Sequence, residues 1–144
     1  MIGKRFDERQ LQIRGEIFFH GLVAAFALLL TNAFLLGSNI VWASGFQQNI
    51  IIIVLIGMVV IIEAIVRDAF FGMGQMRWPI IVTFGIVSIV LLVLGIGSAL
   101  RGHALVKDGG LTDYGFLFAA AIMPVSVTIA GLAKEIAEKR NSKD

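Results

Sequence analysis

Four long apolar runs, separated by short polar or mixed segments, dominate the pattern of this chain. A helix needs about 20 predominantly apolar residues to cross a bilayer, and lipid offers no partner for an unpaired backbone group. Stretches such as "NIIIIVLIGMVVII" are rich in β-branched residues, but their length and lack of alternation favour helix over strand. The pattern therefore predicts transmembrane helices over residues 17–37, 50–66, 79–100 and 114–133.

The predicted fold class is all-α: an integral membrane four-helix bundle made of antiparallel hairpins, in a single membrane domain that covers residues 1–144. Residues 1–16 are expected to form an amphipathic helix, which either lies in the membrane interface or docks a cytosolic partner. Residues 134–144 form a similar charged tail. The second run is the shortest, so its helix is expected to extend beyond the bilayer. Gly109-Gly110 predicts a turn before the fourth helix.

Composition supports a membrane environment. Of the 144 residues, 58% are hydrophobic and only 15% are charged, with a mean hydropathy of +0.89. Soluble domains carry about a quarter charged residues, whereas a charge at the bilayer centre costs about 2.5–3.5 kcal/mol. The chain has no cysteine, so disulfides, thiolate metal sites and thiol nucleophiles are excluded.

Lysine and arginine are unevenly distributed among the segments between the runs. With alternating helix directions, ten of them fall on one side of the membrane: Lys4, Arg5, Arg9, Arg14, Arg67, Arg77, Lys134, Lys139, Arg140 and Lys143. Arg101 and Lys107 fall on the other side. Positive charge concentrates in cytoplasmic segments, so we expect both termini in the cytoplasm. This asymmetry explains the net charge of +2 without a nucleic-acid partner.

A candidate polar cluster lies at the expected cytoplasmic ends of the first two helices and comprises Glu16, His20, Glu63, Arg67 and Asp68. Glu16 and His20 lie four residues apart, as do Glu63 and Arg67, so each pair shares a helix face. Antiparallel packing would bring the two pairs together. We interpret Glu63 as part of an ion pair that reaches the interface; the alternative is a carboxylate that binds a proton or cation on a transport path.

Thr31 and Asn32 are polar residues in the outer half of the first run. An Asn in lipid gains about 0.6–2 kcal/mol by hydrogen bonding to a neighbouring helix. We therefore interpret both residues as helix-packing groups, and we expect partners among the hydroxyl side chains of the third and fourth runs, namely Thr83, Ser88, Ser126 and Thr128.

Small residues and short repeated segments give two further indications. Gly95 with Ala99, and Gly115 with Ala119, form small-xxx-small pairs that favour close helix packing, either within the chain or between copies. The segments "IEAIVRD" and "IAGLAKE" close the second and fourth runs in a similar way. The similarity indicates either a duplicated hairpin or a composition shared by membrane boundaries.

The sequence contains no motif of a catalytic centre. A nucleophile elbow, a phosphate-binding loop and a zinc-binding helix motif are all missing. His20 and His103 fall on opposite sides of the membrane in the expected topology, so they cannot share a metal ion. We therefore expect no catalytic residues, no metal site, no cofactor and no enzymatic activity.

The motif "DERQ" before the first run, together with "RDAFFG" after the second, resembles a group of small bacterial four-span membrane proteins without an established activity. The matching positions are Asp7, Glu8, Arg9 and Gln10 in the first motif, and Arg67, Asp68 and Gly72 in the second. The resemblance implies a multi-pass protein of a bacterial inner membrane. It brings no chemistry with it.

These observations predict a non-enzymatic membrane protein that acts as an accessory, regulatory or self-associating subunit. The expected partners are membrane lipid and a second copy or another membrane subunit. The alternative function is a small oligomeric transporter or channel in which Glu63 is the intramembrane carboxylate.

Overall fold

The computed structural model of the chain describes residues 7–70 and 78–141. This part contains four helices long and apolar enough to cross a membrane: α1 (Glu8–Gly37), α2 (Gly45–Val66), α3 (Trp78–Leu100) and α4 (Asp113–Asn141). Each helix contains one predicted apolar run, so the all-α prediction is confirmed. The charged residues 8–16 and 134–141 belong to α1 and α4 without a break. Gly72 and Arg77 lie outside the described residues.

Two of the helices begin with a capping box. The Asp7 side chain accepts a hydrogen bond from the Gln10 backbone N–H at 2.6 Å, and the Gln10 side chain accepts one from the Asp7 backbone. Ser44 and Gln47 make the same reciprocal pair at the start of α2. Each box satisfies two backbone donors that a helix start leaves open. The first and last residues of the "DERQ" motif are therefore a helix-start signal.

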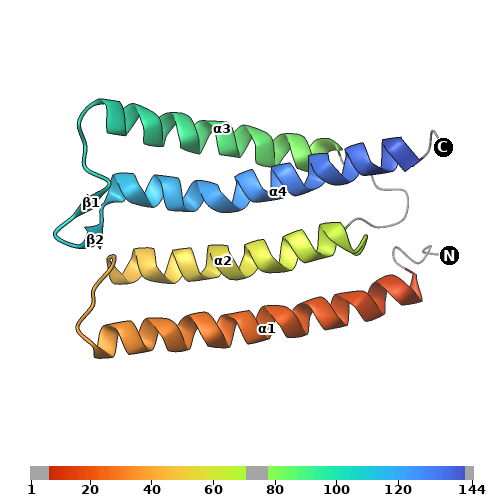
Figure 1. Cartoon of the computed structure of the whole chain (residues 1–144), viewed down its shortest axis with the longest axis horizontal. Coiled ribbons are helices and arrows are strands. Elements are labelled where there is room, and N and C mark those ends of the chain that lie inside the picture. The colour runs from red at the N-terminus through yellow and green to blue at the C-terminus, as the bar shows by residue number, and fades with distance from the viewer. Residues whose placement is uncertain (1–6, 71–77, 142–144) are drawn as a thin grey trace.

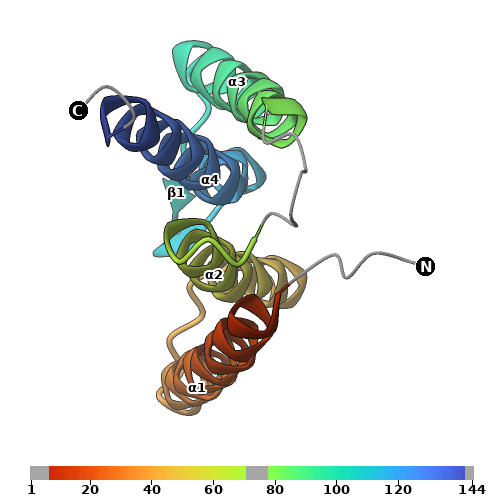
Figure 2. The same cartoon turned by 90° about the vertical axis from the view of Figure 1, so that its right-hand side faces the viewer.

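The helices lie side by side in the order α1, α2, α4, α3, as Figures 1 and 2 show. The extensive contacts follow this order: α1 packs on α2, α2 on α4, and α4 on α3. Ile65 of α2 and Val127 of α4 are the largest fully buried side chains. The structure is thus consistent with the predicted four-helix bundle, and its four helices form an open row.

The row consists of two antiparallel hairpins whose second helices meet. Within each hairpin the helices run in opposite directions, whereas α2 and α4 run in the same direction at the centre (Figure 1). Ile17 packs with Ala64 in the first hairpin, and a Cβ on Gly131 would lie 2.8 Å from the Ile81 side chain in the second. Ala64 and Gly131 occupy the same position in "IEAIVRD" and "IAGLAKE". The arrangement is the one expected for a duplicated hairpin.

A small β-hairpin joins α3 to α4. Its strands β1 (Val106–Lys107) and β2 (Gly110–Leu111) pair antiparallel. Asp108 and Gly109 form the turn with φ values of +50° and +78°, which suits a two-residue hairpin loop. The predicted turn at Gly109-Gly110 is therefore wrong by one residue, because Gly110 pairs with Lys107 in the ladder.

The β-hairpin also connects the two helical hairpins at this end of the molecule. The Leu111 backbone N–H donates to the Trp42 carbonyl at 2.7 Å, which links β2 to the loop between α1 and α2. Thr112 then accepts a hydrogen bond from the Gly115 backbone through its hydroxyl and so caps the start of α4. We call this end the hairpin end and the opposite end, where the polar cluster lies, the cluster end.

Candidate functional site

The structure brings four of the five predicted cluster residues into one network at the cluster end. Antiparallel packing places Glu16 and His20 of α1 opposite Glu63 of α2. Arg67, the first residue after α2, lies on the same side. His20 Nδ1 lies 2.9 and 3.0 Å from the two Glu63 carboxylate oxygens. Arg67 donates to Glu63 at 3.0 Å through Nη1 and to Glu16 through Nη2. Every member is therefore bonded to at least one other.

The charges within this cluster compensate one another. The hydrogen bond to Glu16, followed by that to Glu63, raises the pKa of Arg67 above its ordinary value, so the guanidinium remains protonated. When Glu63 is ionised its carboxylate only accepts hydrogen bonds, and the shared proton then lies on Nδ1 of His20. The side chain of Glu63 is 23% exposed and that of His20 is 51% exposed. The network thus lies at the edge of the helix pair and is open to its surroundings.

Asp68 is separate from the other four residues. It adopts a φ of +59° just after the end of α2, in the left-handed conformation that follows many helix ends. Its carboxylate accepts a hydrogen bond from Lys134 of α4 at 2.7 Å. Lys134 also donates to the Val66 carbonyl at 3.2 Å. Asp68 therefore connects the two helical hairpins, whereas the cluster connects α1 to α2.

The end of α2 receives two more side chains, both from α1. Gln10 donates to the Asp68 carbonyl at 2.8 Å, and Arg14 donates to the Ala69 carbonyl at 2.9 Å. Asp68 and Ala69 follow the C-cap Arg67, so these two donors hold the segment just after α2 against α1. Through Gln10, the "DERQ" motif touches the "RD" of the second motif. This contact was not predicted from the sequence.

Polar residues within the helices have different partners from those expected. Asn32 accepts a hydrogen bond from the Trp42 indole at 2.8 Å, from the loop that follows α1. Thr31 donates to the Ala27 carbonyl one turn earlier in its own helix. The prediction of partners in the third and fourth helices is therefore wrong for Asn32. Thr83, Ser88 and Thr128 likewise donate to carbonyls four residues earlier in their own helices.

A buried pair of glutamines near the start of α2 was missed in the sequence. Gln47 and Gln48 are 5% and 3% exposed. The Gln47 side chain donates to the Asp113 carboxylate at the start of α4 at 2.7 Å, and Gln48 donates to the Ala43 carbonyl at 2.8 Å. Gln47 at one end and Lys134 at the other therefore hold α2 against α4. Two polar residues directly before an apolar run were the signal that could have revealed them.

Glu63 is the centre of the polar cluster. Among residues 7–70 and 78–141, no group of three His, Asp or Glu side chains has the geometry to hold a metal ion. The Glu63 carboxylate is engaged by both His20 and Arg67.

No protein-family model, curated protein or solved structure matches the chain. The interpretation of function therefore depends on the geometry of the helices and their polar contacts.

Proposed function

We propose that the protein is a non-enzymatic, multi-pass subunit of a bacterial inner membrane, which acts by associating laterally with a second copy or another membrane protein. The observation that carries this proposal is the open row of helices (Figure 2). In the apolar stretch of α1 only 6% of the residues are buried, and in the apolar stretch of α4 only 22% are buried. Close packing of matching helix surfaces drives association in lipid. Most of the helix surface of this protein has no other helix against it.

The charge distribution supports an orientation with the cluster end in the cytoplasm. The start of α1 and the end of α4 lie at the same end of the row (Figure 1). Arg14, Arg67 and Lys134 gather there, whereas the hairpin end carries Arg101 and Lys107. This asymmetry is that of cytoplasmic and external loops.

The contacts at the cluster end support an accessory role over chemistry. In the network of Glu16, His20, Glu63 and Arg67, the guanidinium pairs with both carboxylates and fixes α1 against α2. Such a network holds α1 and α2 in a constant arrangement, so this pair presents constant helix faces to a partner. Rigid elements need less ordering when they associate, so they bind with a smaller entropic cost.

An oligomeric transporter is the second candidate, and one contact favours it. The His20 imidazole lies against Glu63 within hydrogen-bonding distance and remains partly exposed, an arrangement that could pass a proton between the two groups. A single row of helices encloses no path, so transport would require several copies around Glu63. Proton and cation flux into liposomes tests this. Flux that is abolished in Glu63→Gln but kept in the exposed control Glu138→Gln would establish it.

The association itself is tested by fluorescence energy transfer in liposomes. Two batches of purified protein, labelled with donor or acceptor, are reconstituted together over a wide range of protein-to-lipid ratios. The proposal predicts energy transfer that saturates at low protein density and falls when unlabelled protein is added. A partner subunit would instead appear as a stoichiometric species after mild solubilisation of native membranes. Energy transfer at the level of random proximity, with no such species, contradicts the proposal.

A further inference from the structure

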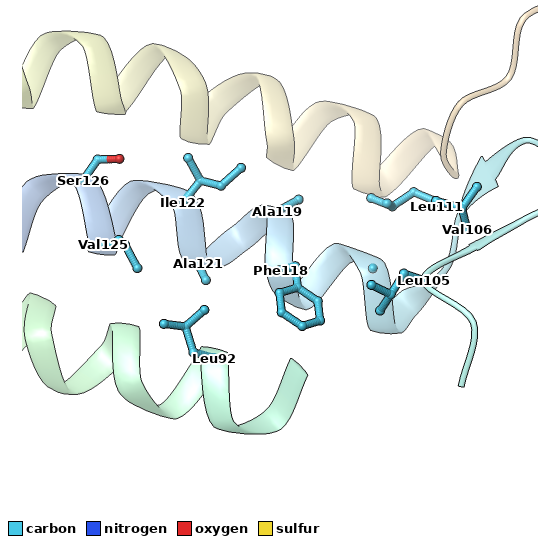
Figure 3. Close-up of a pocket in the computed structure, with 11 residues that line it drawn as sticks. Leu92, Leu105, Val106, Leu111, Phe118, Ala119, Ala121, Ile122, Val125 and Ser126 are labelled. Carbon is cyan, nitrogen blue, oxygen red and sulfur yellow. The ribbon is translucent and has the colours of Figure 1, made fainter. Parts of the chain in front are cut away.

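An apolar groove with a volume of about 630 Å³ runs along α4 from the β-hairpin (Figure 3). Its lining comes from three elements: Leu92 of α3, Leu105 and its neighbours in the β-hairpin segment, and a series of α4 residues between Gly115 and Ser126. This size falls within the range of about 300–1,000 Å³ typical of small-molecule sites. The groove lies at the hairpin end and shares no residue with the polar cluster.

Close contacts hold the walls of the groove in place. A Cβ on Gly115 would lie within hard contact of the Leu105 carbonyl oxygen, so glycine allows the hairpin to approach α4. Gly95 similarly allows the Phe118 ring to lie against α3, since a Cβ there would be 3.0 Å from the ring. Ala119 follows Gly115 by one turn and adds little side-chain volume to the floor. The groove is therefore framed by tightly packed walls.

The length of the groove identifies its occupant. Gly115 and Ser126 are eleven residues apart, which is about 16 Å along a helix at 1.5 Å per residue. The hydrocarbon core is about 30 Å thick, so the groove covers about one leaflet. A transmembrane helix of a second copy would need a channel of the full thickness. We propose that the groove binds one acyl chain of a glycerophospholipid from the leaflet on the hairpin side.

The charges beside the groove indicate an anionic headgroup. Arg101 and Lys107 lie in the segment between α3 and α4, and Lys107 directly follows the lining residue Val106. Neither side chain has a hydrogen bond or ion pair with any residue that the structure describes. Residues 101–111 carry two positive charges, on Arg101 and Lys107, and one negative charge, on Asp108. The net charge of this segment is therefore +1 when His103 is neutral. A lipid phosphate at the end of the groove would supply the missing anion.

The headgroup determines which lipid is retained. An acyl chain that moves from bulk lipid into the groove gains little from the hydrophobic effect, because both surroundings are apolar. Discrimination therefore comes from the charged contacts, and each Lys or Arg near the surface contributes about fivefold in affinity. We expect phosphatidylglycerol to bind about fivefold to 25-fold more tightly than phosphatidylcholine of the same chain length.

Native mass spectrometry of the purified full chain tests the proposal, with phosphatidylglycerol or phosphatidylcholine titrated into a delipidated sample. Ala119→Phe places a ring in the groove, and Ala33→Phe is the matched control on the exposed face of α1. Wild type and Ala33→Phe should bind one phosphatidylglycerol that Ala119→Phe loses. Arg101→Gln with Lys107→Gln should reduce the preference for phosphatidylglycerol over phosphatidylcholine about fivefold to 25-fold. Equal binding by wild type and Ala119→Phe overturns the proposal.

Photo-crosslinking tests the same groove even if Ala119→Phe fails to fold. A photoreactive amino acid is introduced at Ile122, which lines the groove, or at Ala33 as the control position. Irradiation of protein purified in lipid-free detergent should add the mass of one co-purified phospholipid at Ile122 and none at Ala33. Crosslinking of Ile122 to a second copy, or equal lipid adducts at both positions, contradicts the assignment. Neither outcome alters the energy-transfer test of lateral association.

Discussion

The contact of α1 with α2 depends on the absence of a side chain at Gly21. A Cβ at this position would lie 2.5 Å from the Val60 Cγ2 atom, about 1 Å closer than the 3.5–4.0 Å at which carbon atoms attract most strongly. Val60 is β-branched and cannot easily rotate away. Gly21→Ala therefore forces the two helices apart, at a cost of about 1–3 kcal/mol for overpacking. The gain in helix propensity, about 0.5–1 kcal/mol, offsets part of this cost.

The expected net effect of Gly21→Ala is a loss of about 0–2.5 kcal/mol in the free energy of unfolding. Gly15→Ala is the matched control on the same helix, because a Cβ there meets nothing within 4 Å. We expect this control to be neutral or slightly more stable than wild type. Gly21→Ala combined with Val60→Ala should recover stability relative to Gly21→Ala alone, since the second change removes the clashing methyl group.

Reversible unfolding in mixed micelles, titrated with SDS and followed by circular dichroism, measures these differences. A change of 1.4 kcal/mol alters the folding equilibrium tenfold, so the expected loss is well within reach. The reasoning fails if Gly21→Ala is as stable as Gly15→Ala. It also fails if Val60→Ala worsens the Gly21→Ala variant, because the loss would then come from somewhere other than the contact between α1 and α2.

Three further predictions follow from the polar contacts. A double-mutant cycle with Asn32→Ala and Trp42→Phe should give a coupling energy of about 0.6–1.7 kcal/mol in SDS unfolding; additive effects would contradict the hydrogen bond. Lys134→Met should lower the thermal midpoint in wild type but have much less effect in Asp68→Asn, because their ion pair is then already lost. Arg67→Gln should lower the thermal midpoint because Glu16 and Glu63 lose their shared cation, and an unchanged midpoint would show that the network does not hold α1 to α2.

Hydrophobic patterning was sufficient to predict the four helices. Once the helices are known, the four-residue spacings predict which polar residues share a helix face. Glu63 and Arg67 share a face by helix geometry alone, and a short connection makes α1 and α2 antiparallel neighbours. The convergence of Glu16 and His20 on this pair follows from those two facts. The prediction that Asp68 belongs to the cluster is not supported by this geometry. Asp68 directly follows Arg67 and so points to a different side of α2, where it pairs with Lys134 of α4.

The order of the helices could not be predicted, because helices in lipid are apolar on every side. In a water-soluble protein, a stripe of hydrophobic residues identifies the buried face of a helix. The helices of this protein have no such stripe, because their polar and apolar residues are not on separate faces. The contact between Asp68 and Lys134 depends on α2 lying beside α4, which no local pattern encodes. The bond from Trp42 to Asn32 was missed for a different reason: we sought a partner on another helix, whereas a loop folds back along α1.

The central claim is that the helices form an open row with α1 and α3 at its opposite edges. The chain lacks cysteine, so spin labels can be attached at Ala27→Cys in α1 and Ile89→Cys in α3 without removing native thiols. Electron–electron double resonance in liposomes, with the labelled protein diluted in unlabelled protein, then measures the distance within one chain. Three helix spacings of about 8–10 Å each predict a distance above about 20 Å. A distance of about 10–14 Å, as in a closed bundle, would contradict the account.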